Sequence, residues 1–144
     1  MKIAILAVIA LACPALVIST PATAQHMNDL EGPCRGSAST VDLTACLGEA
    51  FRDAQSELDS VYARTLEYTD SVTQNRLRQS QRAWIAYRKH ACEADAAPYL
   101  RATGEGPARL ACLEAITAER TQFLVRSLGW RVEKFASEAE GRNP

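Results

Sequence analysis

Apolar and polar positions divide the chain into one continuous apolar run and a long region of helical periodicity. Residues 3–18 are almost wholly apolar and follow a single positive charge at Lys2. From Leu43 onward, apolar residues recur at three- and four-residue steps over 43–65, 77–92 and 110–128. This spacing gathers apolar side chains on one face of an α-helix, whereas a half-buried strand needs a two-residue period. The pattern therefore predicts three amphipathic helices and no sheet.

Capping residues and prolines predict where these helices start. Thr40 is a suitable N-cap for the first helix, and Asp42 in its first turn suits the positive end of the helix dipole. Thr73 is the corresponding cap of the second helix. Pro107 fits the first position of the third, where a missing backbone N–H costs nothing.

Breakers predict where the helices end. The first is interrupted at 69–71, the second at Pro98 and the third near Gly129. Residues 25–40 then form an extended lead-in, and residues 130–144 a charged, flexible tail. Three helices over 41–129 with short connections predict an all-α fold, a small up-down-up bundle.

The N-terminal apolar run has the features of a signal peptide that is cleaved after residue 24. Ala22 and Ala24 supply the small residues that a signal peptidase accepts. The run is broken by Pro14 and is shorter than the ~20 residues of a membrane-spanning helix. A lipoprotein anchored through Cys13 is the alternative, but Ala10 stands where a lipoprotein box has leucine. We therefore expect a periplasmic or secreted protein.

Size and charge exclude some classes of function. The chain has 16 basic and 17 acidic residues, and the signal peptide carries away Lys2 and no acid, which leaves a net charge of about −2. Nucleic-acid binders present a basic face, so none is expected here. The remaining length of about 120 residues makes a single domain.

Four cysteines remain after Cys13 is removed, and an even number in a short exported chain indicates two disulfides. No C-x-x-C motif is present, which argues against a zinc site and a thioredoxin-like centre. The pairs Cys34–Cys46 and Cys92–Cys112 are favoured because each closes a short segment. Cys46–Cys92 with Cys34–Cys112 is nearly as good, so the pairing stays open at this point.

Two polar residues interrupt the apolar face of the second predicted helix. Gln81 and Arg88 lie on the face that Leu77, Trp84 and Ile85 define. A buried guanidinium needs an acceptor, because an unpaired buried charge is strongly destabilising.

Glu57 on the first helix is the best candidate acceptor, and Thr117 interrupts the facing side of the third. We favour a buried network of these polar residues that fixes helix register. The alternative is a partner-binding surface built on Trp84, Tyr87 and Arg88, since interfaces are enriched in such residues.

Catalysis finds little support in the sequence. His90 falls on the solvent face, and the cysteines are accounted for as crosslinks, so no free thiol remains as a nucleophile. Glu93 and Asp95 are ordinary helix-surface charges. We expect neither an enzyme nor a cofactor or metal.

Three blocks of residues carry a resemblance to a known family. The first is the segment 81–88, with glutamine, tryptophan and an aromatic–arginine pair, followed by Cys92. The second is Glu57-Leu58-Asp59 with Tyr62, in which Asp59 replaces a usual asparagine. The third is Cys112 with Thr117, Arg120 and Leu124. With this pattern the chain resembles the LprI family, also catalogued as DUF1311, from about Cys34 to Leu124.

The resemblance implies a helical protein of the cell envelope that binds a lysozyme and blocks it without catalysis. The alternative is a structural or interaction module of the envelope with no lysozyme binding. The motif residues are expected to be structural: Glu57, Leu58, Tyr62, Gln81, Trp84, Tyr87, Arg88, Thr117 and Arg120. A partner would instead be met by the loop from Pro98 to Pro107, through Tyr99, Arg101 and Glu105, unless this loop is a plain connector.

Overall fold

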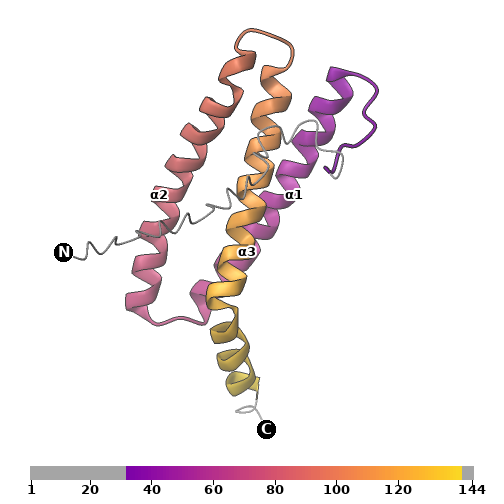
Figure 1. The fold of residues 1–144 in the computed structure, drawn as a ribbon. Helices are drawn as coiled ribbons and strands as arrows, with labels where there is room; N and C mark the ends of the chain where they lie inside the picture. Colours follow the sequence, from indigo (N-terminus) through magenta and orange to yellow (C-terminus); the bar gives the residue numbers. More distant parts are fainter. Residues whose placement is uncertain (1–31, 141–144) are drawn as a thin grey trace, which may run out of the picture.

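The computed structural model describes residues 32–140, and these form three long α-helices in up-down-up order (Figure 1). Helix α1 spans Thr40–Glu67, α2 spans Ser71–Ala96 and α3 spans Glu105–Glu140, with a short 3-10 helix, η2, at Ala97–Tyr99. The all-α, three-helix prediction is confirmed. None of these helices is long and apolar enough to cross a membrane. The predicted signal peptide lies outside the described residues.

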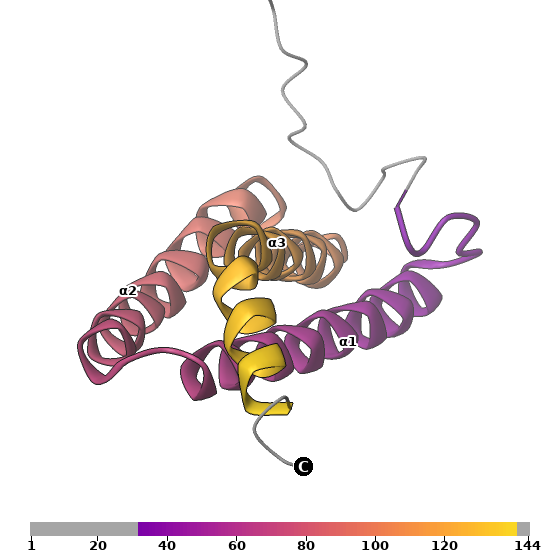
Figure 2. The ribbon, with the colours of Figure 1, turned by 90° about the horizontal axis from the view of Figure 1, so that it is seen from below.

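Helix α3 forms the centre of the bundle. It packs against both α1 and α2, whereas α1 and α2 have few direct contacts with each other. The two diverge from the turn at 68–70, as the view along the bundle shows (Figure 2). Arg88 of α2 reaches Gln55 and Phe51 of α1 across the space between these helices.

Both predicted N-caps are wrong by one to three residues. Ser39, not Thr40, caps α1, and its hydroxyl oxygen accepts the backbone N–H of Asp42 at 3.1 Å. Asp70, not Thr73, caps α2. Thr73 donates its backbone N–H (2.9 Å) and its hydroxyl (2.7 Å) to the Asp70 carboxylate. In each case an earlier oxygen-bearing side chain reaches the orphan N–H groups of the first turn.

The predicted limits of α3 are also wrong at both ends. The helix begins at Glu105, two residues before Pro107, and continues through Gly129 to Glu140. Its apolar face goes on past Gly129, because Leu128 packs on the core and Val132 is buried. Packing against α1 therefore outweighs the weak helix propensity of a single glycine.

The core consists of two clusters along the bundle. Near the α1–α2 turn, Leu58, Leu77 and Leu124 are buried together with Trp84 packed on them. At the opposite end, Cys34, Leu47 and Ala111 form the second cluster. Ile85, which was predicted on the buried stripe, is 48% exposed. Since α2 packs mainly on one helix, its buried arc is too narrow to include this residue.

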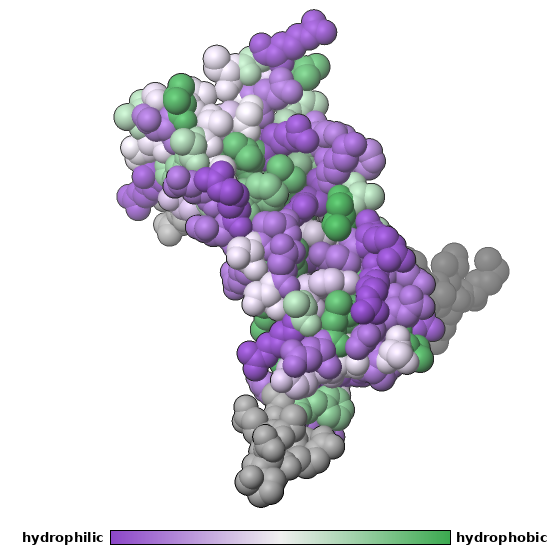
Figure 3. Space-filling view, turned by 180° about the vertical axis from the view of Figure 1, so that it is seen from behind, coloured by the Kyte–Doolittle hydropathy of each residue, from purple (hydrophilic) through white to green (hydrophobic). Residues whose placement is uncertain are grey.

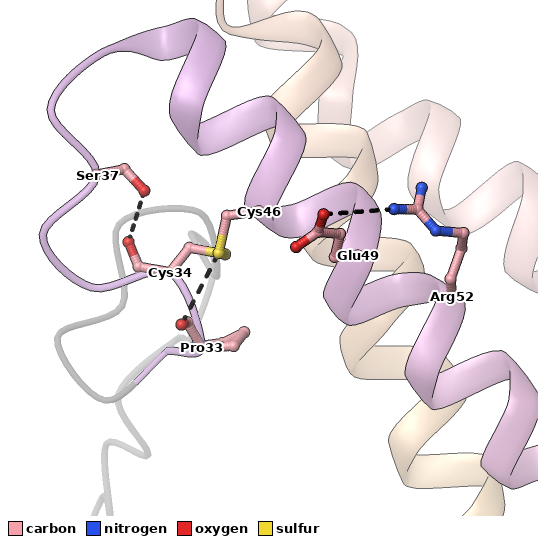
Figure 4. The surroundings of a disulfide bond; sticks show 6 residues. All are labelled: Pro33, Cys34, Ser37, Cys46, Glu49 and Arg52. Atoms are coloured by element: carbon pink, nitrogen blue, oxygen red, sulfur yellow. Dashed lines mark hydrogen bonds and ion pairs between the residues drawn. A yellow bond between two sulfur atoms is a disulfide. The ribbon is translucent and has the colours of Figure 1, made fainter.

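Two disulfides close the end of the bundle far from the α1–α2 turn. They join Cys34 to Cys46 and Cys92 to Cys112, which confirms the favoured pairing. Around the first bond the lead-in folds back on α1, and the Ser37 hydroxyl donates to the Cys34 carbonyl at 3.0 Å (Figure 4). The second bond ties the end of α2 to the start of α3.

Candidate functional site

The connection between α2 and α3 forms an exposed tip at one end of the molecule (Figure 1). It is a run of tight turns in which the backbone N–H groups of Leu100, Ala102 and Glu105 each donate to the carbonyl three residues earlier. The Leu100 side chain is 65% exposed at this tip. We call residues 97–105 the tip loop.

Arg101 in this loop has a backbone conformation that is unusual for its residue type. Its φ of +64° lies in the left-handed region, which costs a residue with a Cβ atom about 1–2 kcal/mol. The backbone N–H of Arg101 donates to the Glu105 carboxylate at 2.7 Å, and this bond helps to hold the conformation. The Arg101 side chain is exposed. The structure thus brings Arg101 and Glu105 together, but the contact is made by the backbone of Arg101 and not by its guanidinium group.

The base of the tip loop is fixed from several sides. The Cys92–Cys112 disulfide joins the two helices below it, and Pro107 and Ala108 are buried. Tyr99 is half-buried and lies over Gly104, where an added Cβ would come within 3.0 Å of the ring. Tyr99 therefore packs within the loop and contributes less to its outer surface than Leu100 does.

Beside the loop the surface has a hollow of about 250 Å³. It is lined by Glu93, Ala96, Ala97, Leu100, Glu105 and Arg109. Apolar and charged groups of both signs meet here, so an approaching protein side chain would find both kinds of contact.

A second feature lies between the helices, where Arg88 crosses from α2 toward α1. Its Nη1 donates to Gln55 Oε1 and to Thr117 Oγ1, both at 2.7 Å. The prediction that Glu57 accepts from Arg88 is wrong, because the Glu57 side chain is exposed. Gln55 lies two residues earlier, and this different helix phase turns its amide toward Arg88.

Aromatic rings surround the same guanidinium. Its carbon lies 4.6 Å from the centroid of the Trp84 ring and 5.4 Å from that of Phe51. Such cation–π contacts stabilise an arginine that has lost part of its hydration.

Arg120 on α3 contacts Trp84 as well, at 5.8 Å from the ring centroid. Its Nε donates to Gln81 Oε1 at 3.2 Å and its Nη2 to Ser80 Oγ at 3.0 Å. Burial lowers the pKa of both Arg88 and Arg120, although the negative charge of Asp59 partly opposes this shift at Arg88. We call Trp84, Arg88 and Arg120 the tryptophan–arginine cluster.

The remaining family-motif residues divide by burial. Leu58, Gln81 and Thr117 are buried and Tyr62 is half-buried, whereas Glu57 and Tyr87 are exposed. The structure therefore brings Gln81 and Thr117 together with the tryptophan–arginine cluster, and leaves Glu57 and Tyr87 outside it.

His90 lies near the C-terminal end of α2. This side chain is exposed, and its Nδ1 lies 3.2 Å from the Glu93 carboxylate of the same helix. Residues 32–135 contain no group of three or more His, Cys, Asp or Glu side chains that could hold a metal ion.

Several residues of these sites were not predicted from the sequence, and Phe51 beside Arg88 is one of them. Gln55 and Ser80 hold the two arginines, and Leu100 forms the exposed tip. The involvement of Gln55 could have been predicted from its position three residues before Leu58, which places both residues on the same face of the helix. Ser80 gives no comparable signal, because its role depends on how far Arg120 reaches from another helix.

Comparison with known proteins agrees with this architecture. The model of the lysozyme inhibitor LprI family matches residues 34–124, which include all four disulfide cysteines. An uncharacterized protein of Rhizobium meliloti (strain 1021) is 30% identical over 130 residues, covering 78% of this chain and 91% of the relative. No solved structure matches. The helices, the two disulfides and the matched sequence blocks together show that this chain belongs to the LprI family of lysozyme inhibitors.

Proposed function

We propose that this protein is an exported lysozyme inhibitor, which binds a lysozyme and blocks its cleft without catalysis. The observation that carries the proposal is the family match from residue 34 to 124, which covers the bundle from the first disulfide cysteine to the buried Leu124. The two disulfides support the proposed export to the periplasm or beyond, because such bonds form and persist in oxidising compartments.

The tip loop is the proposed inhibitory element. A glycosidase such as lysozyme cleaves its substrate in a site with two carboxyl groups, so a blocking element should be convex and cationic. The tip loop offers the exposed Leu100 for apolar contact and the exposed Arg101 for pairing with a carboxylate. Its fixed base also reduces the entropy lost on binding.

An inhibition assay tests this function. The mature protein with both disulfides formed is titrated against c-type, g-type and i-type lysozymes acting on cell walls. We expect at least one type to lose activity at micromolar or lower inhibitor. If all three keep full activity, the inhibitor proposal is wrong, and an interaction module of the envelope takes its place.

A further inference from the structure

The two arginines of the tryptophan–arginine cluster carry charges that no carboxylate of the described residues neutralises directly. Neither forms an ion pair with a residue that the structure describes. Arg88 is held by the neutral oxygen atoms of Gln55 and Thr117, and Arg120 by those of Gln81 and Ser80. Half-buried charges are usually paired, because desolvation without a counter-ion is costly.

Both guanidinium groups keep hydrogen-bond donors unused. Among the described residues, Arg88 forms both of its hydrogen bonds through Nη1, so Nε and Nη2 remain. Arg120 forms its hydrogen bonds through Nε and Nη2, so Nη1 remains. No buried side-chain nitrogen or oxygen in the described part of the chain lacks a partner, so these donors are open to solvent. An arginine with a free Nε–Nη2 edge matches the two oxygens of a carboxylate.

The charges around the cluster do not already supply a counter-ion from α2. From residue 71 to 92, the helix that carries Trp84 and Arg88 has no acidic residue. Two groups of α1 act electrostatically on the cluster, Asp59 on Arg88 and Tyr62 on Arg120. Asp59 also accepts a hydrogen bond from Gln55 Nε2 at 2.9 Å. Asp59 is exposed and its charge is therefore screened by solvent, so the net charge at the cluster stays positive.

We propose that Arg88 and Arg120 bind a carboxylate beside the Trp84 ring, which makes the tryptophan–arginine cluster a ligand site as well as a packing element. The oxygens would take the Nε–Nη2 edge of Arg88 and the Nη1 of Arg120. The carboxylate belongs either to a small free acid or to an acidic peptide segment. This site is independent of lysozyme inhibition by the tip loop.

Trp84 supplies the readout for a binding experiment. Replacing the exposed Trp130 by Phe leaves Trp84 as the one tryptophan in the mature chain, so its emission reports on the cluster. Glutarate serves as the small acid and a tetraglutamate peptide as the peptide, with a tetraglutamine peptide as the uncharged control. We expect saturable emission changes with at least one of the carboxylates and none with tetraglutamine.

Matched variants separate this site from general charge effects. Arg88→Gln and Arg120→Gln should each weaken binding at least about tenfold, as for loss of a hydrogen bond to a charged group. Arg82→Gln removes the same charge from the exposed face of α2 and should leave binding nearly unchanged. Circular dichroism verifies that each variant is folded. If a glutamine variant unfolds, Arg88→Lys or Arg120→Lys replaces it, because lysine keeps the positive charge but lacks the two parallel N–H donors of a guanidinium, and binding should again be weaker.

Nitrogen-15 NMR of the unaltered protein gives a second measurement, because the Nε–H signal of Arg88 should move on titration with the bound carboxylate. The proposal is overturned if neither carboxylate gives saturable binding, or if binding survives in the folded Arg88 and Arg120 variants. Binding of glutarate alone would assign the site to a free acid, and binding of the peptide alone to an acidic segment; either supports the proposal.

Discussion

Thr117 shows how much a single buried side chain does at the residue scale. It is fully buried on α3, accepts from Arg88 Nη1 at 2.7 Å and donates its own hydroxyl to the Leu113 carbonyl at 2.6 Å. One hydroxyl thus links the α2 arginine to the central helix. Gln55 is the other acceptor among the described residues, so loss of the Thr117 hydroxyl would leave the guanidinium hydrogen-bonded to α1 alone.

Thr117→Val keeps the shape of this side chain and removes its oxygen. We expect the free energy of unfolding to fall by about 1–3 kcal/mol, because a hydrogen bond to a charged group is lost at a partly buried site. Urea unfolding measures the change. Thr103→Val in the exposed loop is the control, and an equally small effect of both substitutions would contradict the role assigned to Thr117.

At the residue scale, the sequence predicted that Arg88 needs a hydrogen-bond acceptor, but the residue predicted for this role was wrong. Charge pointed to Glu57, whereas the helix phase puts the neutral Gln55 opposite Arg88. The exact phase depends on how α1 crosses α3, which no local pattern encodes. The left-handed backbone of Arg101 was equally hidden, because arginine rarely adopts it.

At the element scale, the cap of α2 makes part of the stability depend on pH. The backbone N–H and then the hydroxyl of Thr73 donate to the Asp70 carboxylate and hold its pKa below the ordinary value of 3.8. Arg131 of α3 also lies 4.0 Å from this carboxylate. Folding therefore favours the ionised form. The stabilisation is complete above the unfolded pKa and is lost as the pH falls through the lower folded value.

Asp70→Asn keeps a capping oxygen but removes this titration. We expect the wild type to be more stable than the variant at neutral pH, and the difference to shrink as the pH is lowered below the pKa of the unfolded aspartate. Thermal unfolding of both proteins across this range measures it. A difference in Tm that stays constant down to the lowest pH would show that Asp70 does not titrate with folding.

Gly129 provides a second element-scale prediction, because α3 passes through it with ordinary helical geometry. A Cβ added there would meet Val125 Cγ1 at 3.8 Å, an ordinary contact. Gly129→Ala should therefore stabilise the protein by up to about 1 kcal/mol, the difference in helix propensity. Gly36→Ala should do the opposite, since the φ of +87° at Gly36 disfavours a side chain. If Gly129→Ala and Gly36→Ala shift the Tm of thermal unfolding equally, the result would count against a continuous α3.

The helices themselves were predictable in number, order and buried face, because their periodicity extends over many residues. Their ends were not. Several oxygen-bearing residues compete near each N-terminus, and only the folded backbone selects Ser39 and Asp70. The continuation of α3 depends on Val132 packing in the folded bundle, a tertiary contact that overrides the local signal of Gly129.

At the scale of the whole molecule, the two disulfides hold the end of the bundle that carries the tip loop. The Cys92–Cys112 bond ties α2 to α3 at this end, and the Cys34–Cys46 bond ties the lead-in to α1. Cys92 and Cys112 are both buried. Their bond joins residues 20 apart, which encloses the whole tip loop.

Replacing Cys92 and Cys112 together by alanine should lower the free energy of unfolding by about 2–4 kcal/mol. The same change in the Cys34–Cys46 pair is the matched control, since this bond joins the lead-in to α1 and does not enclose the tip loop. On our proposal both variants lose stability, but the Cys92–Cys112 variant loses more lysozyme inhibition under conditions where both are folded. An equal loss of inhibition would argue against inhibition through the loop.

The most direct test of inhibition through the tip loop is the inhibition constant of the Arg101→Glu protein against a lysozyme that the wild type inhibits. The hydrogen bond to Glu105 uses the backbone N–H of residue 101, which a glutamate also has, so the substitution is aimed at the exposed charge alone. Arg82→Glu makes the same change on the outer face of α2. We predict at least about a tenfold weaker inhibition for Arg101→Glu and nearly unchanged inhibition for Arg82→Glu. Equal inhibition by all three proteins would contradict the proposal that the tip loop enters the lysozyme cleft.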